Sequence, residues 1–223
     1  MTRVLVLRPE PGASATLWRA CERGLEAVAI PLFEIEPVAW QAPEPVGFDG
    51  LLLTSANAVR SGGEQLQKLR GLPVYAVGEA TAEAARQAGF DIASTGDSDI
   101  RRLLGSIEPE LKLLHLAGEH RTDRGETSQE IHTVTIYRSR VKEAVQLRGI
   151  EGSIALIHSP RAGRRFAELA DDFGKKSIAI VAISRAAADA AGTGWARVEA
   201  ADIPTDEALL ALAERLCNNT AAK

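Results

Sequence analysis

The chain has 223 residues and a mass of 23.8 kDa, which predicts one large domain or two small ones. Hydrophobic residues make up 45% and charged residues 25%, as in an ordinary globular protein, which excludes a disordered, collagenous or membrane-spanning chain. A net charge of -4 and an aromatic content of 4% argue against nucleic-acid binding. Because Cys21 and Cys217 are the only cysteines and lie far apart, we expect a reducing, cytoplasmic setting without a disulfide framework or metal site.

Short apolar runs alternate with amphipathic segments along the whole chain. The runs predict strands at 4–7, 26–30, 51–53, 74–77, 91–93, 113–116, 154–157, 178–183 and 196–199. The amphipathic segments predict helices at 14–23, 56–69, 80–88, 99–107, 162–173, 185–191 and 205–216. Such alternation is typical of α/β proteins with parallel sheets, and these strands are too many for one small sheet. We therefore expect two three-layer α/β domains, each with a flavodoxin-like parallel sheet.

An internal repeat favours the same division. Residues 49–60 resemble residues 153–164, and residues 74–85 resemble residues 180–191 in the same order. A repeat of this length indicates a duplicated domain rather than a solenoid. The alternative is that two alanine-rich halves look alike through composition alone, but the matching order and lengths favour duplication.

Two segments with alternating apolar and polar residues fit neither half. They lie at 33–40 and 133–140, and alternation is typical of half-exposed strands. We expect them to pair as a two-stranded connector formed by residues 34–39 and 134–140. One domain would then comprise residues 1–33 and 141–223, and the other, inserted domain residues 40–133. Such a connector would let the domains hinge about a cleft.

Polar side chains cluster where the predicted strands end and helices begin. They are Thr54, Ser55 and Asn57, then Gly78, Glu79 and Thr81, then His158, Ser159, Pro160 and Arg161, and finally Ser184 and Arg185. Ligands of α/β sheets bind at the carboxyl ends of strands, where helix starts favour anions. Singly, each of these hydroxyl or amide side chains is better explained as a helix N-cap. As a set presented by both halves, they predict a ligand-binding cleft.

Arginines and one tyrosine add to this set. Arg8, Arg138, Arg161 and Arg185 are candidates to converge on a polycarboxylate, because a guanidinium pairs with carboxylates through two hydrogen bonds. Strand alternation places Tyr137 on the same face as Thr135 and Ser139. Its phenol is either a proton donor into the cleft or packing that covers the hinge.

Several common catalytic patterns are missing. The sequence contains no P-loop, no dinucleotide-binding glycine fingerprint and no nucleophile elbow around Ser55 or Ser159. The four histidines show no metal-ligand spacing, and His115 lies in an apolar run where packing explains it best. We therefore expect no cofactor and no metal.

Four segments together resemble the uroporphyrinogen-III synthase family: 53–59 (LTSANAV), 77–82 (VGEATA), 136–139 (IYRS) and 158–162 (HSPRA). The resemblance covers nearly the whole chain and implies two α/β domains joined by a two-stranded ladder. It implies a cofactor-free lyase that dehydrates hydroxymethylbilane, inverts ring D through a spiro intermediate and closes the macrocycle. Tyr137 matches the tyrosine that the family uses to assist loss of the hydroxyl. The chain departs from the family pattern at 120–132, which is short and polar, and at 183–186.

The function predicted from these observations is that of a monomeric, cytoplasmic uroporphyrinogen-III synthase of heme biosynthesis. Its partner would be the small-molecule substrate hydroxymethylbilane, with no nucleic acid and no membrane. The alternative is a hinged two-domain cytosolic binding or sensor protein, which would use the same cleft without catalysis.

Overall fold

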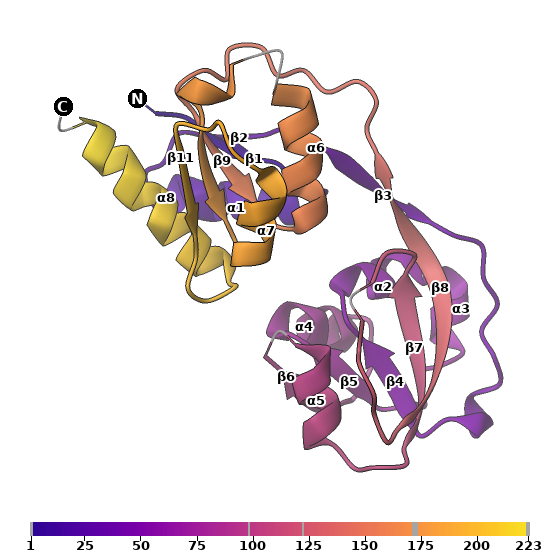
Figure 1. Cartoon of the computed structure of the whole chain (residues 1–223). Helices are drawn as coiled ribbons and strands as arrows, with labels where there is room; N and C mark the ends of the chain where they lie inside the picture. Colours follow the sequence, from indigo (N-terminus) through magenta and orange to yellow (C-terminus); the bar gives the residue numbers. More distant parts are fainter. Residues whose placement is uncertain (1, 98, 122, 171–173, 222–223) are drawn as a thin grey trace. The chain divides into compact units, whose positions relative to one another are not determined.

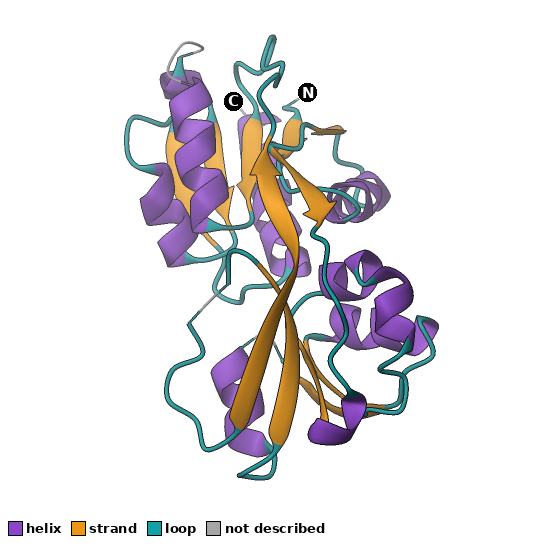
Figure 2. Cartoon of the chain, turned by 90° about the vertical axis from the view of Figure 1, so that its right-hand side faces the viewer, coloured by secondary structure: helices purple, strands orange, loops and turns teal. Residues whose placement is uncertain are grey.

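The computed structural model describes residues 2–97, 99–121, 123–170 and 174–221 (Figure 1). The chain divides into two compact units. Unit 1 comprises Met1–Glu34 and Val141–Lys223, and unit 2 comprises Ile35–Arg140. The α/β class with parallel-dominated sheets is confirmed, because each unit contains such a sheet covered by helices (Figure 2).

The sheet of unit 1 has five parallel strands in the order β2-β1-β9-β10-β11. They are β1 (Val4–Val6), β2 (Ala27–Ala29), β9 (Ile154–Ile157), β10 (Ala179–Ala182) and β11 (Arg197–Ala200). The apolar runs form strands because both faces of this sheet are covered. In β1, Val4 and Val6 pack into one apolar cluster, whereas Leu5 and the following Leu7 pack into the other.

Four helices cover the two faces of this sheet. They are α1 (Gly12–Glu22), α6 (Pro160–Ala170), α7 (Arg185–Ala191) and α8 (Asp206–Ala221). Residues of α6 and α7 lie in the cluster that contains Leu5, and residues of α1 and α8 lie in the cluster that contains Val4. Figure 1 shows α6 and α8 on opposite sides of the strands. Unit 1 therefore has three layers.

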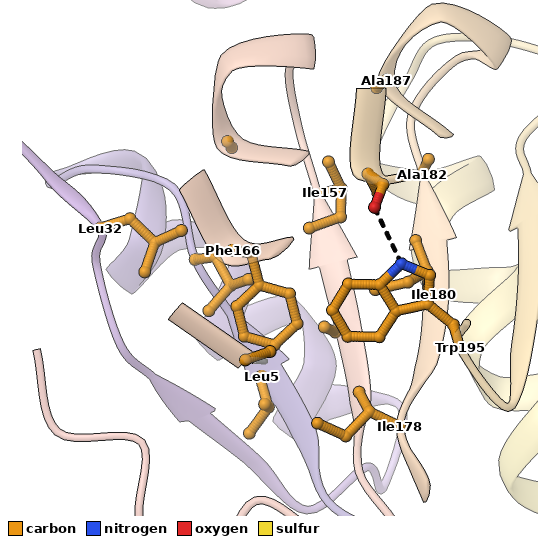
Figure 3. Close-up of a cluster of buried hydrophobic side chains, with 14 of the residues drawn as sticks. Leu5, Leu32, Ile157, Phe166, Ile178, Ile180, Ala182, Ala187 and Trp195 are labelled. Carbon is orange, nitrogen blue, oxygen red and sulfur yellow. Dashed lines mark hydrogen bonds between the residues drawn. The ribbon is translucent and has the colours of Figure 1, made fainter. Parts of the chain in front are cut away.

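The core beside α6 and α7 is built around an aromatic pair. Phe166 and Trp195 stack with ring centroids 5.3 Å apart and planes 5° from parallel (Figure 3). The indole N–H of Trp195 donates to the Ala191 carbonyl at 3.0 Å, so this buried polar group is satisfied. In unit 2, Phe90 is likewise buried in an apolar core.

The sheet of unit 2 has the strand order β3-β8-β7-β4-β5-β6. The strands are β3 (Phe33–Pro37), β4 (Gly50–Leu53), β5 (Val74–Val77), β6 (Ile92–Gly96), β7 (Lys112–Gly118) and β8 (Glu130–Val141). The helices are α2 (Ala56–Ser61), α3 (Gly63–Gln67), α4 (Glu79–Gln87) and α5 (Ile100–Ser106). Helices α2, α3 and α4 supply one apolar cluster and α5 supplies the other, so unit 2 also has three layers.

The segment expected to form one helix over 56–69 differs from the structure. It forms α2 and α3, which are separated at Gly62 and Gly63. Gly63 has a φ of +57°, and a Cβ on Gly62 would lie 2.7 Å from the Leu66 Cβ. The glycine pair therefore ends one helix and starts another.

The connector also differs in part from the expectation. β3 and β8 are neighbours, and the Val38 N–H donates to the Ile136 carbonyl at 2.9 Å. However, β8 also pairs in parallel with β7, so the two strands belong to a six-stranded sheet rather than to a separate ladder. The described part of the segment between β7 and β8, residues 119–121 and 123–129, contains no helix.

The two sheets share one layout with a different chain order. In both, three consecutive strands (β4-β5-β6 or β9-β10-β11) lie side by side, and two further strands (β7-β8 or β1-β2) continue the sheet beyond the first of them. These two strands follow the three in unit 2 and precede them in unit 1. The sequence repeat covers the first two of the three consecutive strands (β4 and β5, or β9 and β10). The strand pairs β7-β8 and β1-β2 match in their place in the sheet but not in sequence. Among the helices of the described residues, none is both long and apolar enough to cross a bilayer.

Candidate functional site

In unit 2, the expected site residues lie at the carboxyl ends of β4 and β5. Ser55 is the N-cap of α2, where its hydroxyl accepts from the Asn57 N–H at 3.2 Å. Gly78, with a φ of +83°, leads into α4, which begins at Glu79 and buries Thr81. The exposed Glu79 carboxylate pairs with Arg86 at 2.6 Å. Ser55 therefore caps its helix, as expected of this residue singly, whereas Glu79 forms an ion pair on the helix surface.

Tyr137 lies beside the start of α2. Burial raises the pKa of its phenol, whereas hydrogen bonds with the Ser55 side chain and the Gly118 backbone lower it, and the net direction is upward. The phenol therefore keeps its proton at neutral pH. A protonated phenol held by the cap of α2 is chemically able to donate that proton.

Strict alternation would place Tyr137 on the opposite face from Ile136. In the structure, Tyr137 and Val134 both pack against the cluster that contains Ile136. The pairing of β7 with β8 changes register between Ala117 and Gly118, because Ala117 is opposite Thr135 and Gly118 is opposite Tyr137. One extra residue in β8 redirects the side chain, as β-bulges do.

Thr54 is paired with a buried histidine. The Thr54 Oγ1 lies 3.2 Å from Nε2 of His115, which stands in β7 and is 3% exposed. Burial, with the nearby charges of Arg121 and Arg124, lowers the pKa of His115 to about 4. The imidazole is therefore neutral at pH 7, and it contacts the Thr54 hydroxyl without carrying charge.

In unit 1, the expected residues lie at the carboxyl ends of β9 and β10. Ser159 accepts from the Ala162 N–H at 3.1 Å, and Pro160 is the first residue of α6. Ser184 caps α7 by accepting from the Ala187 N–H at 3.3 Å, and Arg185 begins that helix. Pro at the first helical position and Ser at the N-cap explain why these helices begin here.

His158 and Arg8 meet at a carboxylate that the sequence did not single out. His158 Nε2 lies 2.9 Å from Asp206 Oδ1, and Arg8 Nη1 lies 3.6 Å from the same oxygen. Thr16 and Arg19 also contact Asp206, at 2.9 Å and 2.6 Å. Burial alone would raise the pKa of Asp206, but its hydrogen bonds with His158, Thr16 and Arg19 lower it to about 2.

The four expected arginines lie in different surroundings. Arg138 pairs with Glu36 at 2.9 Å, and the pKa of that exposed carboxyl is lowered chiefly by this hydrogen bond. The Arg161 guanidinium lies 4.4 Å from the centre of the Phe33 ring. Arg8 contacts Asp206, and Arg185 is exposed on α7. Within unit 1, Arg8 and Arg161 therefore contact different groups, and Arg138 belongs to unit 2.

Comparison with known proteins identifies the family. The family model described as "Uroporphyrinogen-III synthase HemD" matches residues 15–211. The chain belongs to this family. A curated uroporphyrinogen-III synthase from Chlorobaculum parvum is 31% identical over 119 residues, which are 49% of this chain and 48% of that protein. The match thus spans about half the length of the curated relative.

Two solved structures share the fold of this member of the uroporphyrinogen-III synthase family. The uroporphyrinogen-III synthetase of Helicobacter pylori 26695 has a TM-score of 0.69 at 21% identity, covering 96% of this chain and 99% of that one. A mutant uroporphyrinogen III synthase of Thermus thermophilus has a TM-score of 0.57 at 17% identity, covering 98% and 100%. At such identities the likeness concerns the fold.

Sequence reasoning missed Asp206 and Thr16 in this family member. An acidic residue in the first turn of α8 is explained by the helix dipole, and Thr16 lies within a helix. Thr16 is fully buried, and a buried hydroxyl needs a hydrogen-bond partner. This requirement would have pointed to the cluster, but burial cannot be read from the sequence before the fold is known.

Proposed function

We propose that this chain is a uroporphyrinogen-III synthase, a cyclising hydro-lyase that converts hydroxymethylbilane into uroporphyrinogen III in heme biosynthesis. The observation that carries the proposal is the family match over residues 15–211, within which Tyr137 lies hydrogen-bonded to Ser55. Both residues belong to segments that carried the family resemblance. The reaction needs no cofactor, since the substrate's pyrrole supplies the electrons.

Tyr137 is proposed as the proton donor. The carbon–oxygen bond of the substrate's hydroxymethyl group breaks, and the oxygen leaves as water with the phenol proton. The pyrrole nitrogen donates its lone pair through the ring, so that a carbon–carbon double bond forms to the carbon that lost the hydroxyl. The pyrrole N–H then loses its proton to the tyrosinate, which gives the azafulvene and restores the phenol. The azafulvene carbon then bonds to the substituted α-carbon of ring D, which gives the spiro intermediate, and the bond from that carbon to its bridging methylene breaks. The methylene bonds to the free α-carbon of ring D, which loses its proton, and the macrocycle is closed with ring D inverted. The task is chiefly one of orienting a flexible chain.

The substrate-binding set expected from the sequence is part of this proposal. Helix starts at α4 and α6 supply backbone N–H groups for substrate carboxylates, and the arginines supply charge. Thr54 is included because its hydroxyl lies at the end of β4 and is held at 3.2 Å from the neutral His115 ring. We propose that both units contribute, as in the cleft expected from the sequence.

The proposal also includes the origin of the two units, the oligomeric state and the cellular compartment. We propose that the units are duplicated flavodoxin-like domains, a view that their common sheet layout supports. We also propose a monomer acting in the cytosol. The two cysteines are free, which is consistent with a reducing compartment.

The test is a product assay. Hydroxymethylbilane is supplied to the purified protein, the products are oxidised, and the type III and type I porphyrins are quantified. Without enzyme the azafulvene closes without inversion, so type I is the background. Type III in clear excess is expected, and type I alone at the rate of the protein-free control would refute the proposed activity.

A further inference from the structure

Asp206 contacts two other parts of unit 1 that are far from it in sequence, residues 8–19 and residue 158. It is the first residue of α8, and it contacts α1 through Thr16 and Arg19, the loop after β1 through Arg8, and the end of β9 through His158. Two of these four partners, Arg8 and His158, belong to the proposed substrate-binding set. The carboxylate therefore lies behind residues that the proposed function places against substrate.

Both oxygens of Asp206 are used. Oδ1 accepts from Thr16 Oγ1 at 2.9 Å and from His158 Nε2 at 2.9 Å, while Oδ2 accepts from Arg19 Nη1 at 2.6 Å. The Asp206 side chain is 13% exposed and the His158 side chain is 7% exposed, whereas those of Arg8 and Arg19 are 35% and 39% exposed. The carboxylate and the imidazole are thus both largely buried, and the guanidinium groups are the ones that reach solvent.

The state of His158 follows from this arrangement. Burial lowers its pKa below the ordinary value despite the hydrogen bond with Asp206, so the ring is neutral at pH 7. An ionised carboxylate only accepts hydrogen bonds, so His158 donates its Nε2 proton to Asp206. Asp206 thereby fixes both the tautomer and the direction of the imidazole.

Arg8 is held on a second side as well. A Cβ on Gly12 would lie 2.5 Å from Arg8 Nε, so the side chain lies directly against the first turn of α1. The positive end of a helix repels a guanidinium, and a nearby carboxylate offsets that repulsion. Without Asp206, this repulsion would favour other positions of the Arg8 guanidinium.

We propose that Asp206 is a positioning residue of the proposed synthase reaction, holding Arg8 in the orientation in which it binds a substrate carboxylate and fixing the neutral His158 ring beside it. The inference rests on the proposed function. It predicts an effect on substrate binding rather than on the chemical step. Tyr137 and its partners Ser55 and Gly118 all belong to unit 2, so the proton donor does not depend on Asp206.

The experiment compares Asp206→Asn with Glu214→Gln. Asn has the shape of Asp without its charge. Glu214 pairs with Arg23 at 3.3 Å and thus also links α8 to α1, but away from the proposed site residues. KM for hydroxymethylbilane, kcat and Tm are measured for both. In Asp206→Asn, the loss of charge-assisted contacts is expected to raise KM about tenfold, with kcat within about twofold of wild type. In Glu214→Gln, both constants are expected to stay unchanged.

A folded Asp206→Asn protein with unchanged KM would show that the cluster only stabilises the fold, and would overturn the inference while leaving the proposed function intact. If the variant does not fold, Thr16→Val removes one donor to Asp206, together with the acceptor that Thr16 Oγ1 offers to Arg8 Nη1 at 3.4 Å, and keeps every charge. A KM raised about threefold is then expected, and an unchanged KM would again overturn the inference. A wild-type protein that forms no type III product would overturn both proposals.

Discussion

The ring of Tyr137 lies directly against the backbone of Gly118. A Cβ on Gly118 would stand 2.7 Å from Cε2 and Cζ of Tyr137. The two residues face each other where β8 has one residue more than β7. Glycine is therefore required here by the approach of the tyrosine ring, and the position of the proposed proton donor depends on it.

Gly118→Ala is expected to displace the Tyr137 ring and to reduce kcat by at least tenfold, because a general acid acts only within hydrogen-bond reach. The measurement is kcat for type III formation. Gly105→Ala is the control, since a Cβ there meets nothing within 4 Å. That change lies inside α5 and should stabilise the protein by about 0.5–1 kcal/mol without loss of activity. Equal activity of the two variants would contradict the dependence of Tyr137 on Gly118.

Tyr137→Phe keeps the ring and removes the proton donor. Activity should fall by about 10²-fold, because a general acid contributes about 10²–10⁴-fold and this leaving hydroxyl is already activated by an electron-rich pyrrole. The remaining product should still be type III, since inversion depends on how the substrate is held. Tyr75→Phe, a change at the only other tyrosine of the sequence, should retain full activity. Full turnover by Tyr137→Phe would reduce Tyr137 to a packing residue.

His115 should make the protein sensitive to acid. Its pKa is about 4 in the folded chain, against an ordinary value of 6.5, so folding favours the neutral ring. The resulting stability is complete above pH 6.5 and is lost as the pH falls towards 4, by at most about 3 kcal/mol. Urea unfolding between about pH 7 and pH 4 should show a smaller decline in His115→Gln than in wild type. His120→Gln, at an exposed histidine, should follow the wild-type curve. Parallel curves for His115→Gln and wild type would refute this assignment.

Ser159→Ala tests whether that serine is more than a helix cap. Loss of the hydrogen bond from the Ala162 N–H should lower the free energy of unfolding by about 1 kcal/mol, with a modest effect on turnover. Ser14→Ala, on an exposed position of α1, should change neither quantity. Complete inactivation of a folded Ser159→Ala protein would instead indicate a nucleophile.

Much of the fold could be predicted from local pattern. The strands β5 and β9 and the helix α7 have the bounds that the sequence indicates, because an apolar run between helical segments is a local signal of a buried parallel strand. The candidate residues at strand ends could be found for the same reason. The split of 56–69 into two helices was missed, because whether a glycine pair interrupts a helix depends on what packs around it.

The α/β class, the order of the elements and the polar residues at the ends of the strands are all specified locally, since each follows from residues close together in the chain. Which polar residues meet is a property of the folded chain alone. Thr16 and Asp206, which share a hydrogen bond, are 190 positions apart. The direction of Tyr137 depends on how β8 pairs with β7, because a bulge is a property of two strands together. Contacts of this kind are fixed by strand order and register, which alternation of polar and apolar residues does not encode.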